Sequence, residues 1–179
     1  MTDYFALLGE ARHPWLESEK LKEKYFARAR ERPTDAELNE AFRVLSDPKL
    51  RLHHLLVLEG ADLDAGRDLP AALAEFFWNT GRLLRDVDRW LLKHGDASGA
   101  LARALLSGER SKLERKLEEL ESELARRYEA EMTELRDFNS SSPLLPNELG
   151  KLIGSYDSVS YLTRLREQLA EKRFRLKAA

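Results

Sequence analysis

Few side chains in this sequence have the types and spacing that enzymatic chemistry requires. The 179 residues include no cysteine, so no thiolate can act as a nucleophile or bind zinc or an iron–sulfur cluster. The four histidines show no metal-ligand spacing, and Asp86 and Asp88, two positions apart, diverge on a helix. No phosphate-binding glycine loop and no nucleophile elbow occurs. We therefore expect a protein that is not an enzyme, needs no cofactor and acts through binding surfaces.

The strongest candidate for a binding surface is the aromatic run Phe76, Phe77 and Trp78. Successive residues of an α-helix are 100° apart, so the three rings fan over 200° of the helix surface. A core-facing stripe is narrower than this, so at least one ring, for which we choose Trp78, is expected to point elsewhere. The alternative is that Trp78 packs against the N-terminal region or the linker. Aromatic residues with arginine nearby are typical of binding hot spots.

Lys20, Lys24 and Arg28 recur every fourth residue and so form a row of cations on one helix face. One interpretation of this row is a solvated helix flank whose charges are balanced by neighbouring glutamates. Over the chain, 30 basic and 32 acidic residues leave a net charge of -2, which gives no pull toward nucleic acid or an anionic membrane. We expect neither as a partner.

Apolar residues recur with the 3.6-residue period of an α-helix almost everywhere, and no strand pattern of any length occurs. The sequence therefore predicts an all-α fold. Helices are expected over about residues 3–8, 16–31, 35–45, 48–60, 71–93, 109–138 and 147–176. No apolar run approaches the ~20 residues of a membrane span, and the first residues lack the pattern of a secretory signal. We expect a soluble, cytoplasmic protein with no membrane partner.

Two of the predicted helices carry clear start signals. Thr34, followed three residues later by Glu37, forms a capping box in which each side chain bonds the backbone of the other residue. Pro48 occupies the first position of the next helix, after a capping residue at Ser46 or Asp47.

Residues 61–70 contain glycine, aspartate and proline and predict a linker between an N-terminal domain (1–60) and a C-terminal domain (71–179). Three long amphipathic helices joined by short loops predict an antiparallel three-helix bundle for the C-terminal domain. Its apolar stripes can drive folding, because burying one leucine contributes roughly 1.5–3 kcal/mol. The N-terminal domain has only a small core, and we expect contacts with the bundle to stabilise it.

Residues 3–9, Asp-Tyr-Phe-Ala-Leu-Leu-Gly, and residues 38–48, Leu-Asn-Glu-Ala-Phe-Arg-Val-Leu-Ser-Asp-Pro, resemble the opening and the third helix of a J domain. Residues 51–63 resemble the junction that follows the J domain in HscB, the co-chaperone of bacterial iron–sulfur cluster assembly. A J domain followed by a three-helix bundle is also the HscB architecture. The resemblance implies a J-like helical hairpin at the N-terminus and a function in chaperone-assisted cluster assembly.

The resemblance also implies two interfaces, of which the first faces a DnaK-type or HscA-type chaperone. In J domains a His-Pro-Asp turn, together with a basic face on the second helix, makes that chaperone hydrolyse ATP. Here the turn reads Arg32, Pro33 and Thr34, and the loop that follows it is shortened. The row of cations would supply the basic face. Because the aspartate is missing, we expect no stimulation of a chaperone ATPase.

The second implied interface is a patch on the bundle that binds the cluster scaffold IscU in HscB. By position, this patch comprises Phe77, Trp78, Gly81, Arg82, Arg85 and Tyr161. The family patch is acidic, whereas Arg82 and Arg85 reverse the charge here, which predicts an acidic partner or a changed scaffold. We expect an HscB-like co-chaperone or adaptor that binds a partner protein. The alternative is a structural helical protein that has kept the fold and lost both interfaces.

Overall fold

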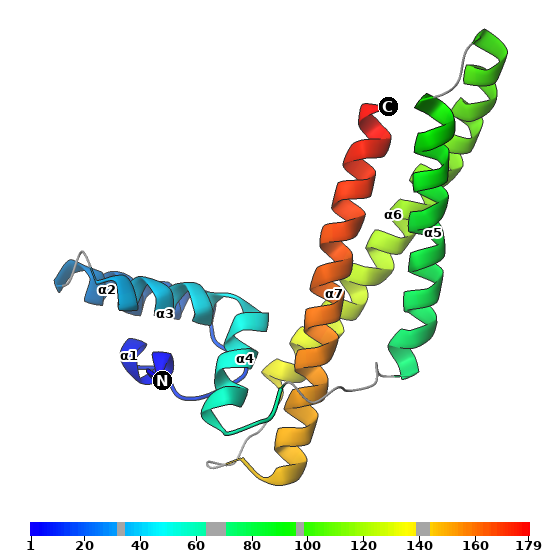
Figure 1. Cartoon of the computed structure of the whole chain (residues 1–179). Coiled ribbons are helices and arrows are strands. Elements are labelled where there is room, and N and C mark those ends of the chain that lie inside the picture. The colour runs from blue at the N-terminus through cyan, green and yellow to red at the C-terminus, as the bar shows by residue number, and fades with distance from the viewer. Residues whose placement is uncertain (32–34, 64–70, 96–98, 139–143) are drawn as a thin grey trace. The chain divides into compact units, whose positions relative to one another are not determined.

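The protein is all-α, as predicted. The computed structural model describes residues 1–31, 35–63, 71–95, 99–138 and 144–179, and no strand occurs in these ranges (Figure 1). The helices are α1 (Tyr4–Leu8), α2 (Ser18–Glu31), α3 (Ala36–Ser46), α4 (Pro48–Leu58), α5 (Ala71–Gly95), α6 (Ala100–Arg136) and α7 (Pro146–Ala178). Within the described residues, no helix has the length and apolarity needed to cross a membrane.

The short helices begin and end at residues whose chemistry explains the boundary. The Asp3 carboxylate accepts hydrogen bonds from the backbone N–H groups at the start of α1, and Gly9 ends that helix in the left-handed region (φ 69°). Asp47 caps α4 by accepting from the Leu50 N–H (2.9 Å), and Pro48 follows at the first helical position. Both features of α4 confirm the prediction.

The predicted capping box at the start of α3 is wrong. The N-cap is Asp35, whose carboxylate accepts from the N–H groups of Glu37 and Leu38, both at 3.0 Å. The Glu37 carboxylate instead accepts from the Thr2 hydroxyl. Thr34 lies outside the described residues. Asp35 is the N-cap because aspartate caps a helix at least as well as threonine, and because the helix dipole stabilises its negative charge at the N-terminus.

The predicted start of α6 near Glu109 is also wrong, because the helix already begins at Ala100. Its first turns are rich in alanine and leucine, which are strong helix formers, and Gly108 is too weak a breaker to stop them. Tertiary contacts hold this extension, since Leu106 is buried and its carbonyl accepts a hydrogen bond from the Trp90 indole N–H (2.9 Å).

The chain forms two compact units. The first comprises Met1–Arg67 and Ala130–Ser160, and the second comprises Asp68–Glu129 and Tyr161–Ala179. The division differs from the sequence-based limits at residues 60 and 71, because the end of α6 and the start of α7 belong with the N-terminal helices. Each unit is therefore assembled from two separate stretches of sequence.

In the first unit, α3 packs against α1, α2 and α4. The contacts between α2 and α3 include aromatic stacking, since the rings of Tyr25 and Phe42 lie 4.3 Å apart, and the Tyr25 hydroxyl donates to Asn39 Oδ1 (2.7 Å). The side chains buried most deeply in these four helices are apolar. They are Phe5, Leu8, Leu21, Leu38, Ala41, Leu45, Leu52, Leu55 and Leu56.

One cation lies inside this core. The Arg51 side chain, on α4, is only 3% exposed. Its Nε donates to the Pro14 carbonyl (2.8 Å) and its Nη1 donates to the Leu45 carbonyl (2.7 Å). A buried charge is tolerated only when it is well hydrogen-bonded. The two bonds also give partners to carbonyls that are not hydrogen-bonded within a helix. Arg51 thereby ties the segment before α2 to the end of α3.

The end of α6 contacts the segment between α1 and α2 through polar and cation–π interactions. The His13 Nε2–H group donates to the Phe138 carbonyl (3.0 Å), while His13 Nδ1 accepts from the Trp15 N–H (3.1 Å). The Arg136 guanidinium lies 4.6 Å from the centre of the Trp15 ring. These contacts explain why residues 130–138 belong to the first unit.

The start of α7 contacts α4 and α6 in the same unit. The rings of His53 and Tyr156 lie 5.8 Å apart. On α6, Glu131 is half-buried, and its carboxylate is hydrogen-bonded by the side chains of Ser155 and Ser158. Burial raises the pKa of Glu131, because the charged form loses more solvation than the two serine hydroxyls return.

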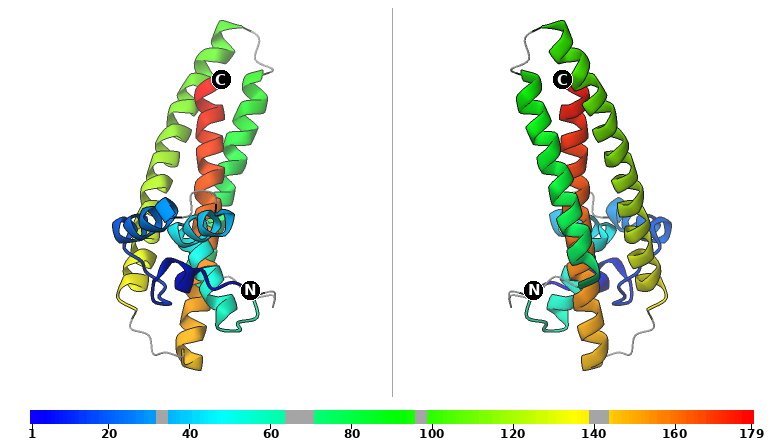
Figure 2. Two further views of the ribbon diagram at one scale, coloured as in Figure 1. Left: turned by 90° about the vertical axis from the view of Figure 1, so that its left-hand side faces the viewer. Right: turned by 90° about the vertical axis from the view of Figure 1, so that its right-hand side faces the viewer.

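In the second unit, α5 and parts of α6 and α7 run side by side in all views of the ribbon (Figures 1 and 2). Within this unit, α5 runs antiparallel to α6, and α6 runs antiparallel to α7 (Figure 1). The core of this unit contains Leu73, Phe76, Val87, Trp90, Leu106, Leu117, Leu124, Leu162, Leu165, Leu169 and Leu176. Ion pairs join the helices at its edge, including Lys172 with Asp88 (2.5 Å) and Arg173 with Glu121.

His54 makes the stability of the first unit depend on pH. The imidazole is 5% exposed, stacks on the Tyr4 ring (4.4 Å) and accepts the Tyr4 N–H at Nε2 (3.1 Å). Accepting at Nε2 requires the neutral ring. Burial, followed by the repulsion of His53 and Arg12, lowers the pKa of His54 below its ordinary value of 6.5, despite the attraction of Asp3.

We predict that the free energy of unfolding falls as the pH is lowered from 7.5 to 5.5. The unfolded chain binds a proton at His54 near pH 6.5, whereas the folded chain binds it only at lower pH, so acid favours unfolding. His54→Gln keeps an acceptor for the Tyr4 N–H but cannot titrate. Urea unfolding at several pH values should therefore show a weaker pH dependence for His54→Gln. Equal dependence in both proteins would contradict the assignment.

Candidate functional site

The aromatic run on α5 divides between the core and the surface. Phe76 is buried, and the Arg127 guanidinium lies 4.7 Å from its ring centre. Phe77 is 42% exposed and Trp78 is 65% exposed. The prediction that Trp78 points away from the core is therefore confirmed, and its geometric cause is the 100° step between successive helical residues.

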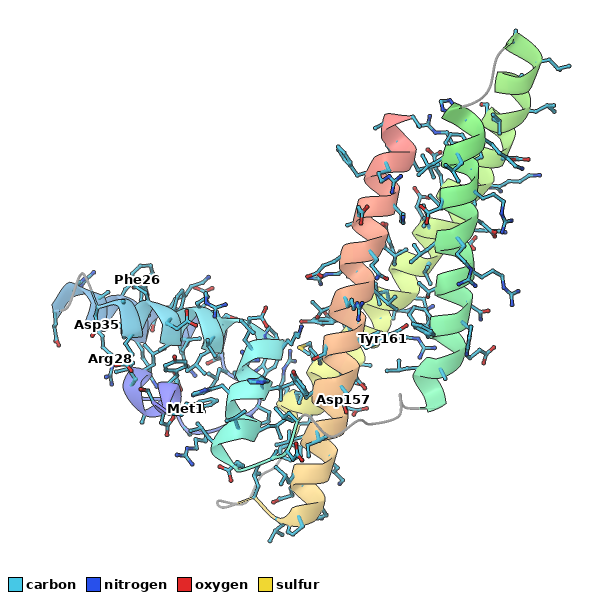
Figure 3. The ribbon with its side chains drawn as sticks, in the orientation of Figure 1. Met1, Phe26, Arg28, Asp35, Asp157 and Tyr161 are labelled. Atoms are coloured by element: carbon cyan, nitrogen blue, oxygen red, sulfur yellow. The ribbon has the colours of Figure 1, made fainter. Side chains whose placement is uncertain are left out.

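The two exposed rings join a third from α7. Phe77 lies 5.9 Å from Trp78 in an edge-on arrangement and 5.5 Å from Tyr161. Tyr161 is half-buried, and Figure 3 labels it on α7. Phe77, Trp78 and Tyr161 are called the aromatic patch below. Aromatic contacts of this kind contribute about 0.5–1.5 kcal/mol beyond the area they bury, so they hold the rings in a fixed arrangement.

The Tyr161 hydroxyl is an unusual part of the patch. Its Oη is fully buried and has no hydrogen-bond partner among the described residues. Burial raises the pKa of Tyr161 to about 12, although the Arg164 charge opposes the shift. The phenol is therefore neutral at physiological pH and cannot serve as a base. It presents its ring to Phe77 and contributes no ionised group.

Two arginines flank the aromatic patch. Arg82 and Arg85 are exposed, and neither forms an ion pair or hydrogen bond with the part of the chain that the structure describes. They follow Trp78 and Gly81 by four residues, one helical turn further along α5. Gly81 is not needed for steric reasons, because a Cβ atom there would meet Arg85 Nη1 at 3.5 Å, an ordinary contact.

The structure thus brings the six bundle residues named from the sequence onto α5 and α7 of the second unit. Phe77 contacts both Trp78 and Tyr161, and the two guanidinium groups lie one and two turns further along α5. Chemically, this arrangement can bury apolar side chains and donate hydrogen bonds to carboxylates. It offers no nucleophile and no acid or base that titrates near neutral pH.

The row of cations on α2 is largely occupied within the first unit. Lys24 Nζ donates to the Gly9 carbonyl (2.7 Å) and pairs with Glu10 (3.0 Å), which neutralises the C-terminal end of α1. Lys20 pairs with Glu17. Arg28 lies beside a shallow hollow of about 90 Å³, which Asp35 also lines, and Figure 3 labels both residues. The neighbouring Arg32, Pro33 and Thr34 lie outside the described residues.

Sequence reasoning did not single out a second cationic surface, on α5 and α6, to which Lys93, Lys112 and Lys116 contribute. The signal was present, because Arg85, Arg89 and Lys93 recur at four-residue intervals, as do Lys112 and Lys116. Within the described ranges, no three His, Asp or Glu side chains are grouped so that they could hold a metal ion.

Comparison with known proteins gives no assignment: no protein-family model matches the chain, and no curated protein matches it.

Replacing Tyr161 by phenylalanine should raise the free energy of unfolding by roughly 1 kcal/mol, because it removes a buried hydroxyl that lacks a partner. Urea unfolding followed by circular dichroism measures this. Tyr25→Phe is the matched control: its hydroxyl bonds Asn39, so its loss should lower stability by about 0.5–1.5 kcal/mol. A loss of stability in Tyr161→Phe would show that the hydroxyl has a partner.

Proposed function

We propose that this protein is a non-enzymatic helical adaptor, similar to HscB-type J-domain co-chaperones, that binds a partner protein through the aromatic patch. The observation that carries the proposal is the 65% exposure of Trp78 next to the half-exposed ring of Phe77. Burying a large apolar side chain fully contributes roughly 1.5–3 kcal/mol, so a folded chain gains by covering such rings. This pair stays uncovered and is held in place by Tyr161.

The composition of the site favours a protein partner over a small molecule. Tryptophan and arginine are the residue types most enriched among interface hot spots, and Arg82 lies one turn from Trp78. The guanidinium groups of Arg82 and Arg85 form no ion pair with the residues that the structure describes. They favour an acidic partner, since an arginine can bind a carboxylate through two parallel hydrogen bonds. By the HscB resemblance, this partner would be a cluster scaffold whose surface charge complements arginine.

The J-like region supports a modified chaperone contact. The cations that would face a DnaK-type or HscA-type chaperone include Lys24, whose ammonium group is already used by α1. The His-Pro-Asp turn of J domains is replaced by Arg32, Pro33 and Thr34. Both features favour a protein that keeps the J-like shape without the ability to stimulate ATP hydrolysis.

The partner test is affinity purification from the native organism followed by mass spectrometry. We expect an acidic protein, or a cluster scaffold, to be recovered with the natural chain and lost with the double variant Trp78→Ala/Arg82→Glu. Truncating a hot-spot residue costs about 2 kcal/mol or more, which weakens binding by about thirtyfold.

Phe26→Ala is the matched control, because Phe26 on α2 is also an exposed aromatic residue (57%) but lies outside the aromatic patch. It should leave recovery unchanged. Recovery of the same proteins with all three chains would contradict a role for the aromatic patch and favour a purely structural protein.

The chaperone test is a single-turnover ATPase assay with DnaK-type and HscA-type chaperones. We expect no acceleration, because the aspartate of the family turn is absent and losing such an interface charge costs about 2–5 kcal/mol of binding. An ordinary J-domain protein serves as the positive control. Acceleration of about tenfold or more by this chain would refute the prediction.

A further inference from the structure

A hollow of about 300 Å³ lies between α5 and α6 in the second unit, away from the aromatic patch. Four cations surround it: Arg89 and Lys93 from α5, and Lys112 and Lys116 from α6. We call this hollow the cationic groove. The two helices are antiparallel neighbours, joined at the end where α5 stops and α6 begins (Figure 2).

The spacing of these residues makes the groove a continuous feature of both helices. The residues that line it recur at intervals of three and four on each helix, from position 86 to 93 and from 109 to 116. Residues at such intervals share one helix face over two turns. The groove therefore extends along the seam between the helices for about 10 Å.

Three of the four cations have no counter-charge in the described part of the chain. Lys93, Lys112 and Lys116 form no ion pair or hydrogen bond there, and Arg89 pairs only with the half-buried Asp86 on its own helix (3.2 Å). Glu109 is the other acidic residue at the groove, and it also forms no such pair. The groove thus holds an excess of positive charge, in a protein whose net charge is -2.

Several cations of α6 and α7 outside the groove pair with acids. Arg110 pairs with Glu114 one turn away (3.0 Å), and Arg173 pairs with Glu121 on the other helix. In the groove, by contrast, Lys112 and Lys116 are one turn apart on the same face. Like charges at that interval destabilise a helix. Contacts within the protein therefore do not explain why two lysines occupy these positions.

The floor of the groove is apolar. Trp90 is buried beneath it, with its indole N–H already used by the Leu106 carbonyl, and Leu113 is half-buried beside it. A ligand that fits must therefore carry negative charge at its edges and an apolar surface on one side. An amphipathic helix rich in glutamate and leucine has both, and a groove between two helices is a common docking place for a third.

We propose that the cationic groove binds an acidic amphipathic segment of a partner protein. Carboxylates of that segment would pair with Lys93, Lys112 and Lys116, while its apolar side chains cover Leu113. Nucleic acid fits less well, because a row of phosphates offers no apolar side chain to cover Leu113. The groove is separate from the aromatic patch and does not depend on the function proposed for it.

The test uses a fluorescein-labelled peptide of about 16 residues with glutamate and leucine at helical spacing, titrated with the full chain and followed by fluorescence anisotropy. We expect saturable binding that weakens as salt is raised. Lys112→Glu/Lys116→Glu should weaken it about tenfold or more, and Lys112→Gln/Lys116→Gln should weaken it to a smaller extent.

The matched control is Lys151→Glu/Lys177→Glu, which reverses two exposed lysines on α7 outside the groove and should change the affinity less than about twofold. Circular dichroism checks that all variants fold. Trp78→Ala should keep peptide binding, which separates this site from the aromatic patch. The proposal is overturned by an absence of peptide binding or by equal losses in groove and control variants. It is also overturned by an oligonucleotide that binds more tightly than the peptide at the same lysines.

Discussion

The first unit depends on one buried cation. Arg51 lies almost completely out of solvent and donates to carbonyls from two segments, the one that precedes α2 and the end of α3. Without hydrogen bonds, burying a guanidinium group would cost far more than its aliphatic stem returns by packing. The arrangement is therefore stable only when both carbonyls are in place. This requirement links the position of α2 to that of α4, and the apolar contacts of α3 fill the space between them.

In the second unit, one face of α5 is buried in the core and the opposite face is exposed to solvent. Phe76, Val87 and Trp90 face the core, whereas Trp78, Arg82 and Arg85 remain in solvent. The exposed face continues as a positively charged row toward the end of the helix, whereas several cations of α6 and α7, such as Arg110 and Arg173, pair with nearby acids. Sequences usually satisfy such local charge rules, and sites where they are broken without compensation are commonly functional. The aromatic patch and the cationic groove both include residues of α5.

Much of the fold could be predicted from local sequence, because caps and apolar periodicity act within a few residues. The Asp47–Pro48 start of α4, the stripes of the bundle and the exposure of Trp78 all follow from such rules. The start of α6 could not be predicted from local sequence, because the hydrogen bond from the Trp90 indole to the Leu106 carbonyl is a tertiary contact. At α3, Thr34 and Asp35 are both good caps, and the prediction chose Thr34 because its spacing to Glu37 matches a capping box, whereas the N-cap is Asp35. The cationic groove was missed because its two halves are on different helices, although each half was visible as a four-residue repeat.

The first unit is discontinuous, since it joins the N-terminal helices to residues 130–160. During translation the ribosome releases the chain from its N-terminus, so α1 to α4 leave the exit tunnel long before their last contacts exist. The contacts of His13 with Phe138 and of Trp15 with Arg136 can form only after residues 136–138 have been synthesised. Closing such long loops is slow compared with local helix formation. The nascent N-terminal segment therefore spends its synthesis time incompletely covered, as a potential client of the chaperone machinery at the ribosome.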